Sequence, residues 1–506
     1  MKIKRKFLKT CLFEKNMKID NVQDIYEDRT DKSKTPKLLL YLGILGVLLL
    51  ISVLVGCMMG PDYERPQFFD NHQIESVLDL QPTSDTQPLS VLDFNDDTLN
   101  ELLSLGLHNS PSIRQAFTKV RQARASVRIS ESDLMPSIDL NAKYNYLNAG
   151  QNMNLFANED YYQSAIDMSW EIDIFGSNAR RLEASKANLR GVIENLKNVH
   201  VSLTANIATA YIGLRTTEWL IQNAEENLRL QNDIYQTVTE QFKAGLADEI
   251  ALNQAKYLLE TTKMSLPQFQ QQKIEFQNTL ALLVGQLPTT LNDILKGQKN
   301  NLVQRNFDYD LTRLYNLPAD IIRNRPDVRV AEEQLIAGNA MIGAAIGDMF
   351  PKISLTALLG FGSTNASNLF ERDSFETGIV PQISLPLLHF GALKNNVELK
   401  KAIKDEYLTA YETALLMGAK EIHNAIHTLQ NEFKRNQSAK SAYQKMKQVA
   451  RLNWQKYKQG LIPYADVLDS EQRKLSAQTN MVNSNAALYQ GIVGYYKAIG
   501  GWVSSK

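Results

Sequence analysis

The chain has 506 residues, a length that as a prior suggests about three domains. Its 55 lysines and arginines equal its 55 aspartates and glutamates, which argues against a nucleic-acid-binding protein, because neutralising phosphates needs a basic excess. Two cysteines, Cys11 and Cys57, exclude a disulfide framework and a cysteine-rich zinc site. A single segment is long and apolar enough to cross a bilayer as a helix, which excludes a polytopic helical membrane protein but not a β-barrel.

That segment lies near the amino terminus, from Leu38 to Val55, directly behind a cluster of lysines. It leads into Leu-Val-Gly-Cys at 54–57, and this order resembles a lipoprotein signal peptide with its lipobox. Residues 1–56 would then be a signal peptide with a long N-terminal region, and Cys57 would carry several acyl chains, which anchor a protein firmly. Met58 replaces the aspartate that retains many lipoproteins in the inner membrane, so we expect an outer-membrane location.

The alternative interpretation of this segment is an uncleaved transmembrane anchor, since its apolar run is just long enough to span. Residues 1–37 are long for the first part of a signal peptide, which a misplaced start codon would explain.

The rest of the chain repeats itself at a constant offset of 215 residues. The matching pairs are Pro111 and Pro326, Pro136 and Pro351, Phe175-Gly176 and Phe390-Gly391, Lys243 to Leu246 and Lys458 to Leu461, and Gly285 and Gly500. We therefore expect an internal duplication, with units at 95–285 and 310–500. A lipidated segment (57–94) precedes them, a linker (286–309) joins them, and a tail (501–506) follows.

Each unit contains two runs in which apolar and polar residues alternate strictly. The first runs cover Ile138 to Tyr146 and Ile353 to Phe361. The second cover Ile166 to Ile174 and Ile379 to Leu387, each after a polar loop. A period of two predicts strands with one apolar and one polar face.

A long helical stretch without proline follows each Phe-Gly pair, from 176 to 244 and from 391 to 459. Apolar residues there step by three and four, which is typical of a coiled-coil seam. At ~1.5 Å per residue such a helix is roughly 100 Å long. Gly245 and Gly460 end these helices, and a returning helix of nearly 40 residues follows each.

Four strands with one apolar face suit a barrel with lipid outside and water inside, but four cannot close one. Open sheet edges in lipid leave backbone groups unpaired at a cost of several kcal/mol each, so several chains must share a barrel. Two copies would give eight strands around an interior filled by side chains, and three would give twelve with room for a lumen.

Four stretches carry a resemblance to a known family. They are CMMGPDYERP at 57–66, WEIDIFG at 170–176, LPADIIRNRPD at 317–327 and GLIPYADVLD at 460–469. With them the chain resembles an outer-membrane factor of the TolC/OprM type, in the lipoprotein branch found in drug-efflux systems. The resemblance implies a membrane α+β fold, a homotrimer whose twelve-stranded transmembrane β-barrel continues into a periplasmic α-helical barrel. It also implies an exit duct that works with a periplasmic adaptor protein and an inner-membrane RND-type transporter.

Asp466 and Asp469 are the candidate gate residues. They lie three positions apart and share a helix face just after Gly460, and the resemblance implies that they line the periplasmic entrance. Three copies would place six carboxylates there, which favours cations. The first unit has Ala251 and Gln254 at these positions, so only the second unit would contribute. The alternative is an ordinary solvated helix face.

The two helix breaks resemble the family's adaptor-docking ends. The expected adaptor contacts are Lys243, Gly245, Leu246, Lys458, Gly460 and Leu461. The alternative is a pair of bare turns with no partner.

His423 and His427 have the i, i+4 spacing that can hold zinc. The sequence between them lacks the glutamate of H-E-x-x-H, and no third ligand is near. We therefore interpret them as structural histidines and predict no metal site, and no cofactor other than lipid on Cys57.

The favoured function is a passive outer-membrane exit channel for drugs or other small toxic compounds. The alternatives are the outer-membrane channel of a type I protein secretion system and a structural coiled-coil protein of the envelope. The lipobox favours efflux over secretion, and the alternating strands argue against a pure coiled coil. The motifs of hydrolases, zinc proteases and nucleotide-binding enzymes are missing, so we expect no enzyme.

Overall fold

The computed structural model describes residues 58–69, 94–147, 159–296, 302–304, 317 and 320–501. Contacts divide the chain into two units, Met1–Gly56 and Cys57–Lys506, and every described residue belongs to the second. The expected signal peptide, the acylated Cys57 and most of the tail therefore lie outside the described residues.

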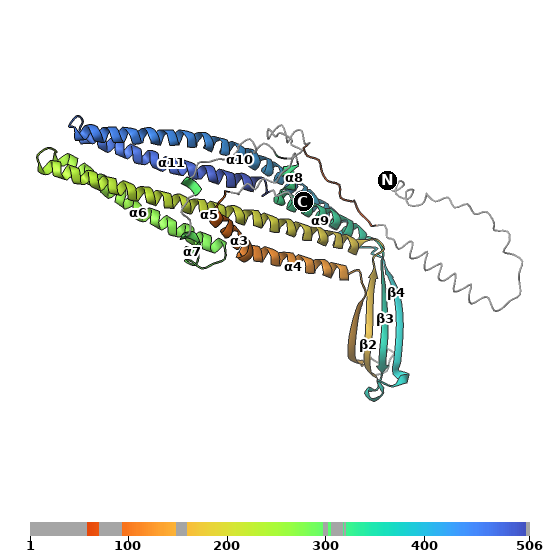
Figure 1. Ribbon diagram of the computed structural model, residues 1–506. Helices are drawn as coiled ribbons and strands as arrows, with labels where there is room; N and C mark the ends of the chain where they lie inside the picture. The colour runs from red at the N-terminus through yellow and green to blue at the C-terminus, as the bar shows by residue number, and fades with distance from the viewer. Residues whose placement is uncertain are drawn as a thin grey trace, which may run out of the picture. The chain divides into compact units, whose positions relative to one another are not determined.

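The described part of the chain contains two successions of the same elements (Figure 1). The first consists of α3 (Asp97–Asn109), α4 (Pro111–Ser132), β1 (Ser137–Leu147), β2 (Glu159–Ile172), α5 (Ser177–Lys243) and α6 (Glu249–Leu283). The second consists of α8 (Ile321–Asn324), α9 (Pro326–Gly347), β3 (Lys352–Ser363), β4 (Phe375–Ser384), α10 (Ala392–Lys458) and α11 (Tyr464–Ala498). Both α5 and α10 have 67 residues, and both α6 and α11 have 35.

Matching residues begin and end these elements. Pro111 and Pro326 occupy the first position of α4 and α9, where a missing backbone N–H costs nothing. Gly176 and Gly391 precede α5 and α10 with φ of +73° and +87°, a left-handed conformation that glycine adopts without strain. The long helices confirm the sequence prediction to within one residue at each end.

The strands form one antiparallel sheet in the order β1-β2-β3-β4. The helices that lead into or out of these strands pack side by side in the same order, α4-α5-α9-α10. Small residues let α5 and α9 approach closely, since Ala184 and Ala187 pack against Ala337 and Ala340. Each strand therefore continues a helix of the layer beside it.

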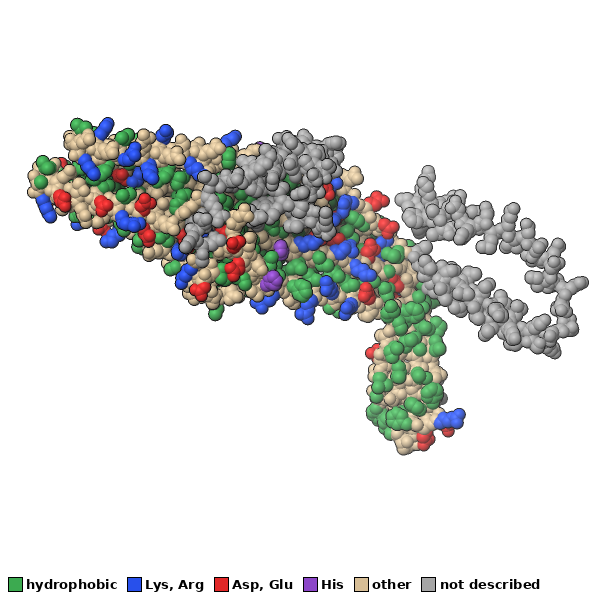
Figure 2. All heavy atoms as spheres, viewed as in Figure 1, with side chains coloured by type: hydrophobic (Ala, Val, Ile, Leu, Met, Phe, Trp, Pro, Cys, Tyr) green, Lys and Arg blue, Asp and Glu red, His purple; other side chains and the backbone are tan. Residues whose placement is uncertain are grey.

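The register gives the sheet two different faces. Even-numbered residues of β1 and β2 share a face with odd-numbered residues of β3 and β4. That face exposes large apolar side chains, among them Ile138, Leu140, Tyr144, Ile166, Leu359, Phe375, Ile379 and Ile383. Figure 2 shows hydrophobic side chains gathered over the strands, whereas charged ones are spread over the helices. The opposite face carries the polar members of the alternation, such as Asp139, Asn141, Asp167 and Gln382.

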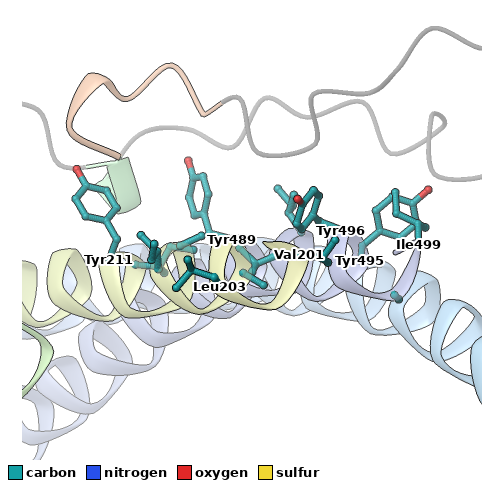
Figure 3. Packing of buried hydrophobic residues seen from close by; sticks show 14 of the residues in the cluster. Val201, Leu203, Tyr211, Tyr489, Tyr495, Tyr496 and Ile499 are labelled. Atoms are coloured by element: carbon teal, nitrogen blue, oxygen red, sulfur yellow. The ribbon is translucent and has the colours of Figure 1, made fainter. Parts of the chain in front are cut away.

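The main hydrophobic core joins the two halves where α5 and α11 run side by side. Tyr211, Tyr495 and Leu203 are buried in it. Figure 3 shows them with Tyr489, Tyr496, Val201 and Ile499, and the tyrosine rings extend from one side of these helices. Leu295 of α7 (Asn292–Lys296) and Leu302 of the short helix η1 (Leu302–Gln304) also enter it. The expected linker thus contributes helical turns and core residues.

Two strand predictions extended too far. β2 ends at Ile172 and β4 at Ser384, so Ile174, Leu385 and Leu387 lie outside the strands. Pro386 explains the second difference, because proline has no N–H for the ladder. Within the described part of the chain, no helix has the length and hydropathy to cross a membrane.

Candidate functional site

Both helical hairpins end in the same turn. Gly245 and Gly460 have φ of +73° and +71°. The N–H of Leu246 donates to Gln241 O at 2.8 Å, and that of Leu461 donates to Lys456 O at 3.0 Å. This pattern, with glycine just past the helix end, satisfies carbonyls that the last turn leaves free. All six expected adaptor-contact residues lie at these two turns, and Leu246 and Leu461 are 80% and 67% exposed.

A small apolar cluster holds the two turns together. Val238 of α5 packs with Ala251 of α6 and with Tyr464 and Val467 of α11. The Tyr457 hydroxyl donates to Gln241 Oε1 at 2.8 Å, which joins α10 to α5. Burial raises the pKa of Tyr464 well above its ordinary value, so this hydroxyl stays neutral. The tips of the two hairpins are therefore one continuous surface.

The candidate gate residues Asp466 and Asp469 lie on an exposed face of the first turns of α11. Arg473 Nε lies 2.9 Å from each carboxylate oxygen of Asp469. In the described part of the chain, the Asp466 carboxylate has no hydrogen bond or ion pair. Sequence reasoning missed Arg473, although its i, i+4 spacing from Asp469 is the signal that could have found it.

A buried polar seam separates the tips from the main core. Asn227 of α5 donates to Gln478 of α11 at 2.8 Å, and Lys474 pairs with Glu471 at 2.5 Å. Both amide atoms of Gln231 are buried and have no hydrogen-bond partner among the described residues. Unsatisfied buried polar groups cost roughly 1–3 kcal/mol, so this stretch stabilises the packing of α5 on α11 less than apolar contacts in its place would. Sequence reasoning did not find this seam.

The apolar face of the sheet carries aromatic side chains at both ends. The rings of Tyr144 and Tyr162 lie 4.8 Å apart at the end far from the helices. At the other end, Trp170 Nε1 donates to Leu134 O at 3.0 Å. Eight residue steps along β2 separate Tyr162 from Trp170, which is about 27 Å of strand at ~3.4 Å per residue. Two levels of aromatic side chains on an apolar face are typical of strands that cross a membrane.

The polar face of the sheet is fixed by a network that crosses three strands. Tyr161 of β2 donates to Glu376 of β4 at 3.1 Å, and Gln163 donates to the same carboxylate. A side chain on Gly362 of β3 would collide with both the tyrosine hydroxyl and the carboxylate. Glycine in β3 therefore lets residues of β2 and β4 meet above it.

Residues 58–69, here called the strap, lie against the start of α5 and along α9. Arg180 of α5 pairs with Asp62 at 2.8 Å, and Arg65 pairs with the buried Glu332 of α9 at 2.5 Å. Gly60, with φ of +97°, lies so close to Gly343 that a Cβ would come within 2.4 Å of its Cα. The residue after the candidate lipidation site Cys57 is thus fixed beside the start of α5.

A polar cluster next to the strap joins α5 to the end of α9. Asp348 accepts hydrogen bonds from Arg181 at 2.6 Å and from Ser177 at 2.9 Å. Burial favours the neutral acid, but these donors outweigh it and hold the pKa of Asp348 below its ordinary value. The carboxylate therefore stabilises the junction between helices and sheet.

Comparison with known proteins decides the family. The family described as outer membrane efflux protein matches residues 102–286 and 317–501. The chain belongs to the outer membrane efflux protein family. It is 28% identical to the cation efflux system protein CusC of Escherichia coli O6:H1, over 88% of this chain and 96% of CusC. It is also 28% identical to the toluene efflux pump outer membrane protein TtgF of Pseudomonas putida, over 88% and 94% of the two chains.

The fold is that of a solved family member. The outer-membrane channel OprN is 28% identical and superposes with a TM-score of 0.79, covering 88% of this chain and 99% of OprN. This outer membrane efflux protein is therefore an outer-membrane exit channel of an efflux system that extends into the periplasm. Its family is one of transport proteins rather than enzymes.

Proposed function

We propose that three copies of this chain form the exit duct of a tripartite pump, with a twelve-stranded barrel continued by an α-helical barrel. The observation that carries the proposal is the pair of strands at the ends of the sheet. Within the described residues, β1 and β4 each pair with one neighbour, and one face of the sheet is apolar. Lipid cannot satisfy the free edges, so β1 of one copy would pair with β4 of the next.

The two halves support an internal duplication as the origin of this wall. Both family matches start and end 215 residues apart, the offset found between the landmarks of the sequence. Each half supplies one strand pair and one helical hairpin.

Lipid on Cys57 would add an anchor at the periplasmic surface of the membrane. The strap supports this placement, because Met59 N–H donates to Phe175 O at 3.3 Å just beyond β2. The acylated residue, two positions earlier, would then lie near the aromatic end marked by Trp170.

The tips would be the periplasmic end of the duct. There the turns at Gly245 and Gly460 would contact the adaptor, which links the duct to an RND-type inner-membrane transporter. Asp466 and Asp469 would line the entrance, with Asp469 already balanced by Arg473.

The cargo would be drugs or other small toxic compounds selected by the transporter. Relatives named for cation efflux and for toluene efflux are equally similar to the chain. A wide duct with a polar wall offers little selectivity of its own, which agrees with the equal similarity of the chain to relatives that export different compounds.

The assembly is tested with purified protein in mild detergent. We expect the mass of three chains by light scattering and step-like conductance in planar lipid bilayers. A single chain without pore activity would contradict the proposal.

Cargo is tested by gene deletion followed by a panel of drugs, dyes, detergents and metal salts. We expect sensitisation that the wild-type gene reverses, with protein secretion unchanged. Loss of a secreted protein without sensitisation would instead indicate the type I secretion channel.

A further inference from the structure

From sequence alone we interpret His423 and His427 as structural residues, but both side chains are exposed and their Nε2 atoms face each other. We propose instead that they form a binding site for a borderline divalent transition-metal ion, with Cu²⁺ bound most tightly. Both imidazoles are exposed on α10, and their Nε2 atoms lie 3.2 Å apart. The site rests on these two side chains and does not depend on the proposed duct.

The distance between the two nitrogens suits a shared ion. Metal–imidazole bonds are about 2.0–2.1 Å long, so two nitrogens at this separation meet one ion at an angle of roughly 100°. That angle lies between the values for cis positions of a square plane and for a tetrahedron. The ring centroids are 4.4 Å apart and the planes are inclined by 64°, so the two imidazoles from adjacent turns lie close enough for small side-chain rotations to bring both nitrogens onto one ion.

Packing on the neighbouring face of α10 holds the pair in this position. Ile422 and Ile426 precede the two histidines by one residue each and are 0% and 2% exposed. Their burial in the main core fixes the rotation of the helix. The helix is continuous from Ala392 to Lys458, so binding requires little reorganisation of the backbone.

The ion would replace a hydrogen bond between the two rings. In the neutral pair one Nε2–H donates to the other Nε2. Binding needs both Nε2 lone pairs, so the donating ring moves its proton from Nε2 to Nδ1. The neutral pair loses no proton, and both imidazoles coordinate as neutral ligands.

The donor set selects the class of metal. Among the described residues, no group of three or more histidines, cysteines or acidic residues is placed to share an ion, so water fills the remaining positions. Imidazole nitrogens suit Cu²⁺, Ni²⁺ and Zn²⁺, and affinity peaks at Cu²⁺. Mg²⁺ and Ca²⁺ prefer oxygen ligands and are not expected to bind here.

The test uses full-length protein without a histidine tag, titrated with Cu²⁺ in detergent by calorimetry. We expect one ion per chain and a copper electron paramagnetic resonance spectrum with splitting from two imidazole nitrogens. His423→Ala or His427→Ala should weaken binding by about tenfold or more, because the second donor is no longer held beside the first. His389→Ala, which removes an exposed imidazole that has no histidine at i±3 or i±4, is the matched control and should leave binding unchanged.

A rescue variant tests the spacing itself. Asn431 is exposed one turn beyond His427, so His423→Ala with Asn431→His recreates an i, i+4 pair. We expect this variant to regain the two-nitrogen spectrum. Unchanged Cu²⁺ binding after replacement of both His423 and His427 by alanine, or equal loss in His389→Ala, would mean an adventitious ion only and overturn the proposal.

Discussion

Arg473 donates to both carboxylate oxygens of Asp469 across one turn of α11, with Nε 2.9 Å from each. The pair is exposed, and such pairs contribute about 0–1 kcal/mol to stability, so its main effect is on local charge. Asp466, one turn closer to the tip, has no such partner in the described part of the chain. The two candidate gate residues are therefore unequal.

Asp466→Asn should weaken block of the channel by divalent cations more than Asp469→Asn does. A carboxylate about 6 Å from a divalent ion in water contributes about 1.4 kcal/mol, or roughly tenfold in affinity. Arg473→Gln should strengthen block, because it frees the charge of Asp469. Single-channel recordings with added divalent salt measure the block in all three variants. Equal block in every variant would show that these residues do not line the entrance. Replacing both aspartates by alanine should in addition raise conductance.

Charge reversal at the tips should impair docking of the adaptor. Lys243→Glu with Lys458→Glu introduces two acidic groups at the turns that carry the exposed Leu246 and Leu461. Cross-linking yield to the adaptor should fall severalfold. Lys445→Glu is the matched control, because Lys445 is exposed on α10 about 20 Å before the turn at ~1.5 Å per residue. Normal cross-linking of the double variant would show that the tips are turns that do not contact the adaptor.

Gly60→Ala should destabilise attachment of the strap. The new Cβ would meet the backbone of Gly343 at 2.4 Å, and such overpacking typically costs about 1–3 kcal/mol. Gly460→Ala shares the positive φ, but no atom of the described residues lies within 4 Å of the new Cβ, so this variant isolates the backbone strain. Thermal unfolding followed by circular dichroism should show the larger loss for Gly60→Ala. Equal losses would show that the close contact contributes nothing.

The junction at Asp348 should weaken in acid. The pKa of Asp348 is lower in the folded protein than its ordinary value, so its stabilisation is present above the unfolded pKa of about 3.9. It is lost as pH falls through the folded pKa. The difference in melting temperature between wild type and Asp348→Asn should be largest near neutral pH and shrink below about pH 4. A difference that does not change with pH would exclude this carboxylate as its cause.

Much of the architecture is local and could be predicted from the sequence. Alternation marked the strands, and glycines at 245 and 460 marked the hairpin turns, because both patterns act within a few residues. The side-by-side order of α4, α5, α9 and α10 depends on tertiary packing, so no local sequence pattern predicted it.

The charges around the candidate site were harder to predict. The partnership of Arg473 with Asp469 was available from spacing, but the buried seam at Asn227, Gln231 and Gln478 joins residues some 250 positions apart. From sequence alone, polar residues on a helix are predicted to face water, and only the position of the opposing helix shows that they are buried. The ion pairs of the strap, such as Arg65 with Glu332, were hidden for the same reason.

The equal lengths of the hairpins restrict how this chain can change. Both long helices have 67 residues and both returning helices 35, so the two turns end level. Deleting one heptad from α5 alone would shift its turn by about 10 Å relative to that of α10. An insertion or deletion in one hairpin therefore keeps the two turns level only if the other hairpin changes by the same number of residues.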